Sequence, residues 1–212
     1  MKRILTAAGL ATLATPALAH HPLGGLPMET FAHGLMSGVG HPVLGFDHLF
    51  FVALMGVAAA YTGRALSAPL AYLGAMLAAC AAVSLGAALP LAELAIVASL
   101  IVLGAVVASG RALSAPVAMA VFAGFGLFHG AAYAGAITGQ EGGAGAPVLL
   151  GYLLGLAAIQ YAIAVAAGFA IRALAPTAGA VNARLAGAMV AGVGLFLGLE
   201  ALEGPLVAAL AG

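Results

Sequence analysis

The sequence HPVLGFDHLFFVALMGVAAAYT, residues 41–62, decides the fold because it joins a polar motif to a long apolar run. A helix needs roughly 20 mainly apolar residues to cross a bilayer, and this run has about that length. His41, Asp47 and His48 stand at its beginning, in a chain made mostly of Ala, Gly, Leu and Val. Ionisable groups within a membrane helix are costly and tend to mark ion or proton pathways. The stretch therefore predicts a membrane helix that begins with a polar site.

The composition of the whole chain also indicates a membrane protein. The 212 residues are 65% hydrophobic and 6% charged, with a mean hydropathy of +1.21. A soluble domain of this size could not bury so large an apolar fraction. Acidic and basic residues are equal in number, which argues against nucleic acid as a partner. The single Cys80 excludes an internal disulfide and dithiol redox chemistry.

Six apolar runs follow one another, each close to the length of a transmembrane helix. They cover residues 42–62, 69–89, 91–109, 116–137, 147–171 and 185–203. We therefore predict an all-α fold, a polytopic membrane helical bundle with six transmembrane helices, over residues 42–212. Residues 20–41 are predicted to form a periplasmic segment with a short helix. Several glycines are spaced four apart, which suits close helix packing: Gly126 and Gly130, Gly151 and Gly155, Gly194 and Gly198.

Residues 1–19 have the pattern of a cleavable secretory signal peptide. A basic start is followed by a short apolar core and by Ala17-Leu18-Ala19, a typical cleavage site. An uncleaved anchor is the alternative. Cleavage after Ala19 would leave His21 second in the mature chain, where its imidazole, a backbone nitrogen and the terminal amine suit Ni(II) or Cu(II). A solvated terminus without a metal is the other interpretation.

The arginines of the mature chain predict its orientation. They fall in the first, third and fifth connections between the apolar runs: Arg64, Arg111, Arg172 and Arg184. Positively charged connections stay in the cytoplasm, so the N-terminus lies outside, as the signal peptide also requires. We predict a multi-pass protein of the bacterial inner membrane with a periplasmic N-terminus.

Two apolar runs carry ionisable residues at similar depths. At 1.5 Å per helical residue, Asp47 and His48 lie roughly 7–9 Å below the outer face. The fourth run travels outward and ends near Ile137, so His129 lies roughly 12 Å below the same face. Imidazole and carboxylate groups suit divalent transition metals. The sequence therefore predicts one metal site between the first and fourth spans, in the outer half of the bundle.

The position of His41 leaves two alternatives. In an unbroken helix His41 would lie roughly 10 Å from His48 along the axis, too far for both to bind one metal. The helix could start late or unwind at Pro42 or Gly45. His41 is therefore either brought in by an irregular turn or serves as a helix N-cap that meets the incoming ion. Asp47 is either a ligand or a group that orients a ligating imidazole.

Three segments resemble the HupE/UreJ family of nickel and cobalt permeases. They are Phe31-Ala32-His33-Gly34-Leu35, His41-Pro42-Val43-Leu44-Gly45-Phe46-Asp47-His48-Leu49 and Phe128-His129-Gly130-Ala131-Ala132. The H-P-x-x-G-x-D-H motif is specific, F-H-G supports it, and the resemblance extends over the mature chain. It implies a permease in which His41, Asp47, His48 and His129 bind the metal, and it extends this role to His33.

The chain departs from the family pattern at three positions, so the resemblance is to a divergent member of the family. The fourth-span motif commonly reads F-H-G-x-A-H-G-x-E, whereas this chain has Tyr133 for the second His and Ala136 for the Glu. Gln160 stands where relatives often have His in the fifth span. Gln160 and Tyr133 are candidates for the ion pathway, although an interhelical hydrogen bond is the simpler interpretation of Gln160.

The expected function is import of Ni²⁺ or Co²⁺ as the transported ion, and Zn²⁺ suits the same ligand types. The alternative is a metal-capture or sensor subunit of the membrane that needs a partner for transport. The ion and the lipid bilayer are the expected partners, and an oligomer is left open. No ATP-binding motif is present, so any ATP drive would come from elsewhere. The motifs H-E-x-x-H and G-x-S-x-G are also absent, and we expect that the protein is not an enzyme. Histidine ligands bind unprotonated, so metal binding should weaken as the pH falls through about 6.5.

Overall fold

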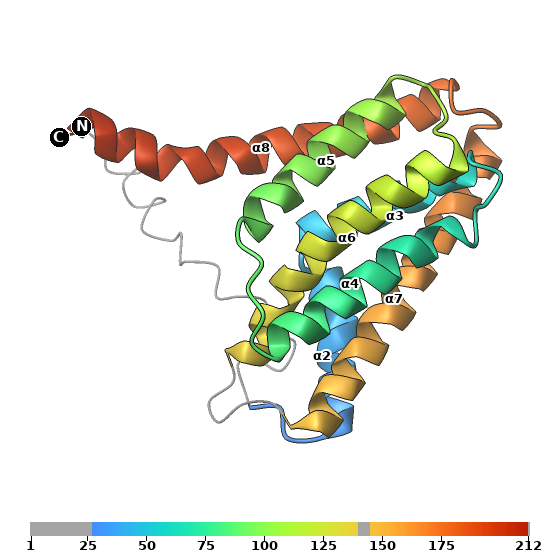
Figure 1. The fold of residues 1–212 in the computed structure, drawn as a ribbon. Coiled ribbons are helices and arrows are strands. Elements are labelled where there is room, and N and C mark those ends of the chain that lie inside the picture. Colours follow the sequence, from blue (N-terminus) through green and yellow to red (C-terminus); the bar gives the residue numbers. More distant parts are fainter. Residues whose placement is uncertain (1–26, 140–144, 212) are drawn as a thin grey trace, which may run out of the picture.

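The computed structural model describes residues 27–139 and 145–211, and within them the fold is entirely helical. The helices are α2 Phe31–Leu44, α3 Phe46–Ala60, α4 Ala68–Ser84, α5 Ala92–Ala108, α6 Ala115–Thr138, α7 Ala146–Leu174 and α8 Val181–Ala211 (Figure 1). The prediction of an all-α fold is thereby confirmed for this part of the chain. The expected signal peptide and His21 lie outside the described residues.

The start of the first expected span differs from the prediction. We expected it at Pro42, but α2 runs through Pro42 to Leu44, and α3 begins at Phe46. The two helices meet at Gly45 with a bend of 81°. A Cβ at Gly45 would lie only 3.0 Å from Cδ2 of His48, so glycine allows the bend to close. The expected division between residues 20–41 and 42–212 therefore falls inside one helix.

Helix α3 is the central helix of the bundle. It is apolar over most of its surface, which is the pattern of a helix buried on all sides. It contacts each of the other six described helices. Around it, α2 packs on α7, α4 on α6 and α5 on α8, as the ribbon shows (Figure 1). Side chains that α3 carries are therefore surrounded by protein from several directions.

Glycines bring the paired helices into backbone contact. A Cβ at Gly38 of α2 would overlap the carbonyl oxygen of Tyr152 on α7. A Cβ at Gly130 of α6 would overlap that of Met76 on α4 in the same way. Small residues let membrane helices approach closely, because no side chain stands between the backbones. The expected packing role of the spaced glycines is confirmed, and it places α6 directly against α4.

Three helices are long and apolar enough to cross a membrane by themselves. They are Ala115–Thr138, Ala146–Leu174 and Val181–Gly204. The bent pair of α2 and α3 together passes the same test, and the apolar helices α4 and α5 are 17 residues long each. The structure thus supports a helical membrane protein with three such spans among its described residues, or four if the bent pair counts as one.

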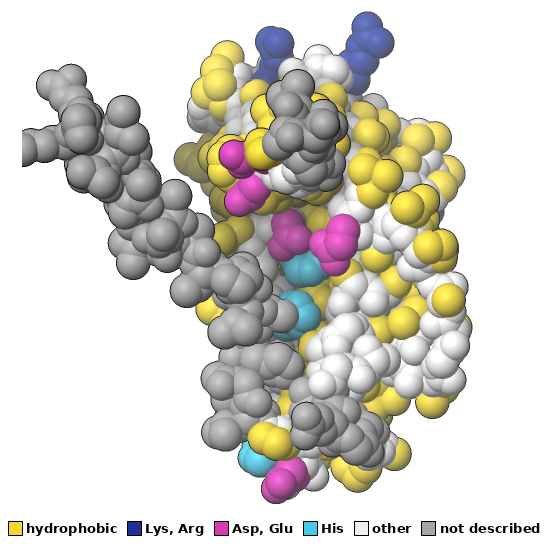
Figure 2. Space-filling model, turned by 90° about the vertical axis from the view of Figure 1, so that its left-hand side faces the viewer, with side chains coloured by type: hydrophobic (Ala, Val, Ile, Leu, Met, Phe, Trp, Pro, Cys, Tyr) yellow, Lys and Arg dark blue, Asp and Glu magenta, His cyan; other side chains and the backbone are white. Residues whose placement is uncertain are grey.

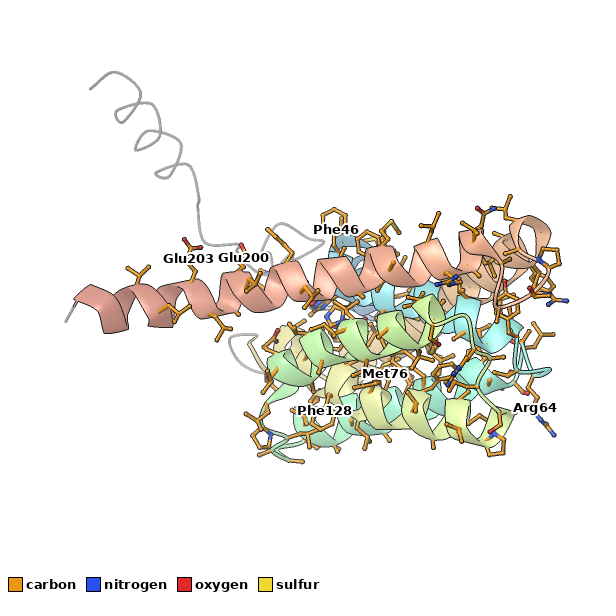
Figure 3. The ribbon with its side chains drawn as sticks, turned by 90° about the horizontal axis from the view of Figure 1, so that it is seen from above. Phe46, Arg64, Met76, Phe128, Glu200 and Glu203 are labelled. Atoms are coloured by element: carbon orange, nitrogen blue, oxygen red, sulfur yellow. The ribbon has the colours of Figure 1, made fainter. Side chains whose placement is uncertain are left out.

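The arginines lie at one end of the bundle. Nε of Arg184 donates to the carbonyl oxygen of Ala108, which joins the start of α8 to the end of α5. The guanidinium of Arg172 lies 5.5 Å from the ring centre of Tyr61, which joins the end of α7 to that of α3. Arg64 lies at this same end, opposite Phe128 (Figure 3). The prediction that the positive charge is one-sided is confirmed for the geometry, and the cytoplasmic identity of this end stays a prediction.

Candidate metal-binding site

The bend at Gly45 folds the end of α2 back over the start of α3. Gly45 donates its backbone N–H to the carbonyl oxygen of His41 at 2.9 Å, which ends α2. The ring centres of His41 and His48 consequently lie 5.7 Å apart. Of the two alternatives for His41, the irregular turn is the one that the structure shows.

His48 on α3 and His129 on α6 are in contact inside the bundle. Their Nδ1 atoms lie 2.9 Å apart, which is a hydrogen-bond distance, although the residues are 81 positions apart in the chain. Both side chains are buried, with exposed fractions of 5% and 0%. Phe51 stacks on the His129 ring with 4.4 Å between ring centres. The comparison of depths predicted similar levels, and the structure adds that the two side chains face each other. We call His41, His48 and His129 the histidine cluster.

Two hydroxyl groups lie within hydrogen-bond distance of ring nitrogens in the histidine cluster. Nε2 of His129 lies 3.1 Å from Oγ of Ser99 on α5. Nδ1 of His41 lies 2.8 Å from the hydroxyl of Tyr152 on α7. Ser99 is fully buried and so is Tyr152. The cluster is thus held by side chains from five helices.

Tyr133 and Gln160, the two candidates for a pathway, lie next to the histidine cluster. The Tyr133 ring packs against His48 and His41, with ring centres 4.3 Å and 5.1 Å away. Gln160 is fully buried, and its Oε1 accepts hydrogen bonds from Tyr72 at 2.7 Å and Tyr133 at 3.2 Å. Gln160 therefore forms the interhelical hydrogen bonds of the simpler interpretation, between α4, α6 and α7.

We expect the change Gln160→Leu to destabilise the protein. It leaves the hydroxyls of Tyr72 and Tyr133 without this buried acceptor, and an unpaired buried group costs about 1–3 kcal/mol. Thermal unfolding in detergent should show a clear fall of the transition temperature. Tyr161→Phe is the matched control on α7, because that hydroxyl makes an exposed hydrogen bond to Leu66. Equal stability of the two variants would contradict the role of Gln160.

Asp47 lies at the edge of the histidine cluster and faces a groove. Its Oδ1 accepts the backbone N–H of His48 at 2.8 Å, in the first turn of α3. With Glu93 it lines a groove of about 690 Å³ between the starts of α3 and α5 and the outer part of α8. Figure 2 shows acidic side chains beside histidines on this face. The carboxylate in the structure orients a backbone N–H, and its second oxygen can meet a cation in the groove.

His33 is separate from the histidine cluster. It lies in the first turn of α2, where its Nδ1 accepts the backbone N–H of Glu29 at 3.3 Å. It lies eight positions before His41 in the same helix, which corresponds to roughly 12 Å. Of the predicted ligands, the structure brings together His41, Asp47, His48 and His129, and it leaves His33 apart.

Three residues of the site were missed by sequence reasoning. Ser99 and Tyr152 contact the histidines directly, and Glu93 shares the groove with Asp47. The available signal was the presence of isolated hydroxyl and carboxyl groups in apolar helices, which tend to have partners when buried. A single such residue does not reveal its partner, since helices that are apolar all round give no facing direction.

The histidine cluster provides paired imidazoles rather than a complete metal shell. In the described ranges, no three side chains of His, Cys, Asp or Glu are arranged as a ready metal site. The ring centres of His41 and His48, and of His48 and His129, nevertheless lie 5.7 Å and 5.1 Å apart. Neutral imidazole is a common ligand of nickel, cobalt and zinc, and water or carboxylate can complete the coordination.

Comparisons with known proteins agree with the motifs. The family model described as HupE / UreJ protein matches residues 8–197. Protein HupE of Rhizobium leguminosarum bv. viciae is 34% identical over 123 residues, which are 57% of this chain and 62% of that protein. The match thus spans less than two thirds of the relative's length. No solved structure matches the chain.

Proposed function

The chain belongs to the HupE/UreJ family, and we propose that it is a membrane permease importing a divalent transition metal ion, nickel or cobalt. The family is one of membrane metal transporters and not of enzymes. The observation that supports the proposal most strongly is the histidine cluster. Ionisable groups are costly to bury in an apolar membrane bundle and tend to mark ion pathways. The ion would pass through the cluster and Asp47, in the outer half of the bundle.

The donor atoms favour nickel or cobalt over softer ions. Imidazole nitrogen and carboxylate oxygen suit Ni²⁺, Co²⁺ and Zn²⁺, whereas Cu⁺ prefers thiolate and thioether sulfur. Cys80 lies in α4 and is buried among apolar residues, and it is the single cysteine of the chain.

His33 and His21 lie nearer the N-terminus in the chain, and we propose that they bind the ion before it reaches the cluster.

The alternative function is a metal-capture or sensor subunit that needs a partner. The deciding experiment uses liposomes that contain the purified chain alone. We expect radioactive nickel or cobalt to enter these liposomes faster than protein-free ones. Binding to the chain without entry would favour the alternative, because a capture subunit holds the ion but does not move it. Absence of both binding and entry would refute both functions.

We propose that the protein crosses the bacterial inner membrane six times, with its N-terminus in the periplasm. The bent pair α2 and α3 would be the first crossing, and α4 to α8 the other five. The shared end of the arginines supports a cytoplasmic position for the connections that carry them. The cleavable signal peptide predicted for residues 1–19 would place the N-terminus on the opposite side.

Labelling of single cysteines tests this topology. We expect Arg64→Cys and Arg111→Cys to react with an impermeant maleimide only after the cells are opened. Ala88→Cys, exposed in the connection between α4 and α5, should react in intact cells. Cys80 is buried and is replaced by alanine for the measurement. Labelling of Arg64→Cys from outside would contradict the orientation.

A further inference from the structure

Two buried hydroxyl groups can only accept hydrogen bonds from the histidine cluster. The hydroxyl of Ser99 donates to the carbonyl oxygen of Ile96 at 2.6 Å. The hydroxyl of Tyr152 donates to the carbonyl oxygen of Tyr133 at 3.0 Å. A hydroxyl group carries one proton, and in both residues that proton is already used. The imidazole nitrogen beside each hydroxyl must therefore bear the proton of the remaining hydrogen bond.

This requirement fixes the tautomers of all three rings when they are neutral. His129 carries its proton on Nε2, which donates to Ser99 at 3.1 Å, so its Nδ1 has a lone pair. That lone pair accepts from Nδ1–H of His48 at 2.9 Å. His41 donates through Nδ1–H to Tyr152 at 2.8 Å. A neutral imidazole has one protonated and one unprotonated nitrogen, so Nε2 is the unprotonated nitrogen in both His48 and His41.

We propose that Ser99 and Tyr152 are positioning residues that select the metal-binding tautomers of His48 and His41. In this arrangement Nε2 of His48 and Nε2 of His41 bind the divalent ion, while His129 transmits the effect of Ser99 and is not itself a ligand. The inference rests on the proposed function, since it assigns roles within the same metal site. It differs in this respect from the expectation that His129 binds the metal directly.

The separation of the two rings fits a shared ion. Two imidazoles that bind one metal at about 2.0–2.1 Å have ring centres roughly 4.5–6.5 Å apart, depending on the angle at the metal. The ring centres of His41 and His48 lie 5.7 Å apart, within this range. Two protein ligands also suit transport, because conduction requires binding that is weak enough for release.

Nitrogen-15 NMR of histidine-labelled protein tests the tautomers without any metal. The chemical shift of a ring nitrogen reports whether it carries a proton. We expect Nδ1–H in His41 and His48 and Nε2–H in His129, for the full chain in detergent micelles. Ser99→Ala removes the acceptor and should convert His129 and His48 to tautomer mixtures. Ser99→Thr should restore the wild-type pattern, since a helical threonine can also bond a carbonyl one turn earlier. A protonated Nε2 in wild-type His48 would overturn the inference.

Nickel titration of the same proteins tests the consequence for the ion. Loss of a residue that orients a metal-bound histidine weakens affinity by roughly 10–100-fold, and we expect this range for Ser99→Ala and Tyr152→Phe. Ser99→Thr should bind like the wild type. Ser109→Ala is the matched control, because that hydroxyl makes the same 2.6 Å bond to a carbonyl three residues earlier in the chain, away from any histidine.

The outcomes separate the inference from the proposed function. Nickel binding by the wild type with unchanged affinity in Ser99→Ala would overturn the inference and leave the permease intact. Wild-type protein that neither binds nor transports nickel or cobalt would refute the permease, and with it the metal-binding half of the inference. Weakened binding in Ser99→Ala with recovery in Ser99→Thr supports both.

Discussion

Replacing His48 with alanine is expected to abolish metal uptake while the protein still enters the membrane. The change removes an imidazole that is proposed to bind the ion and also removes the hydrogen-bond partner of His129. Loss of an orienting partner alone costs roughly 10–100-fold in metal affinity, so loss of a ligand should reduce uptake by at least that factor. Uptake of radioactive nickel into liposomes measures the effect, and the amount of protein in the membrane is measured in parallel.

A neighbouring residue provides the control for this change. Phe46 begins the same helix, is 66% exposed and points away from the bundle (Figure 3). Phe46→Ala should therefore leave uptake close to the wild-type rate. Asp47→Ala should also abolish uptake, because it removes the carboxylate that faces the groove. Normal uptake by His48→Ala would show that the buried histidines only contribute to packing.

The second large effect concerns Gly130, which follows His129 on α6. In Gly130→Ala the new Cβ would overlap the carbonyl oxygen of Met76, so α6 must move away from α4. Overpacking of this kind costs about 1–3 kcal/mol or more. Alanine favours a helix over glycine by only about 1 kcal/mol, so the steric cost should dominate. We expect a lower unfolding temperature in detergent and reduced metal uptake.

The same helix contains a matched control for this prediction. A Cβ at Gly124 would meet no atom within 4 Å, so Gly124→Ala gains helix propensity without a clash. It should be as stable as the wild type or more so. If Gly130→Ala were equally stable, the close contact between α4 and α6 would not contribute to folding. The comparison isolates the helix contact, since both variants change glycine to alanine in α6.

The sequence by itself determined the class of fold and most helix boundaries. Apolar runs of membrane length required helices, because a bilayer offers no hydrogen-bond partner to an open backbone. The fourth run, for example, was expected at 116–137, and α6 covers Ala115–Thr138. Charge placement predicted the shared end of the arginines, and the motif from His41 to His48 indicated the candidate site and the possible break at Gly45.

The tertiary structure alone decided which residues meet. Helices rich in alanine, leucine and glycine are apolar on every side, so their sequence does not indicate which face turns inward. The contact of His48 with His129 depends on the rotation of two helices that glycines hold in place against their neighbours. Ser99 comes from a third helix, and the role proposed for it follows only once the direction of each of its hydrogen bonds is known. Such long-range hydrogen bonds depend on three-dimensional packing, and no local pattern of residues encodes them.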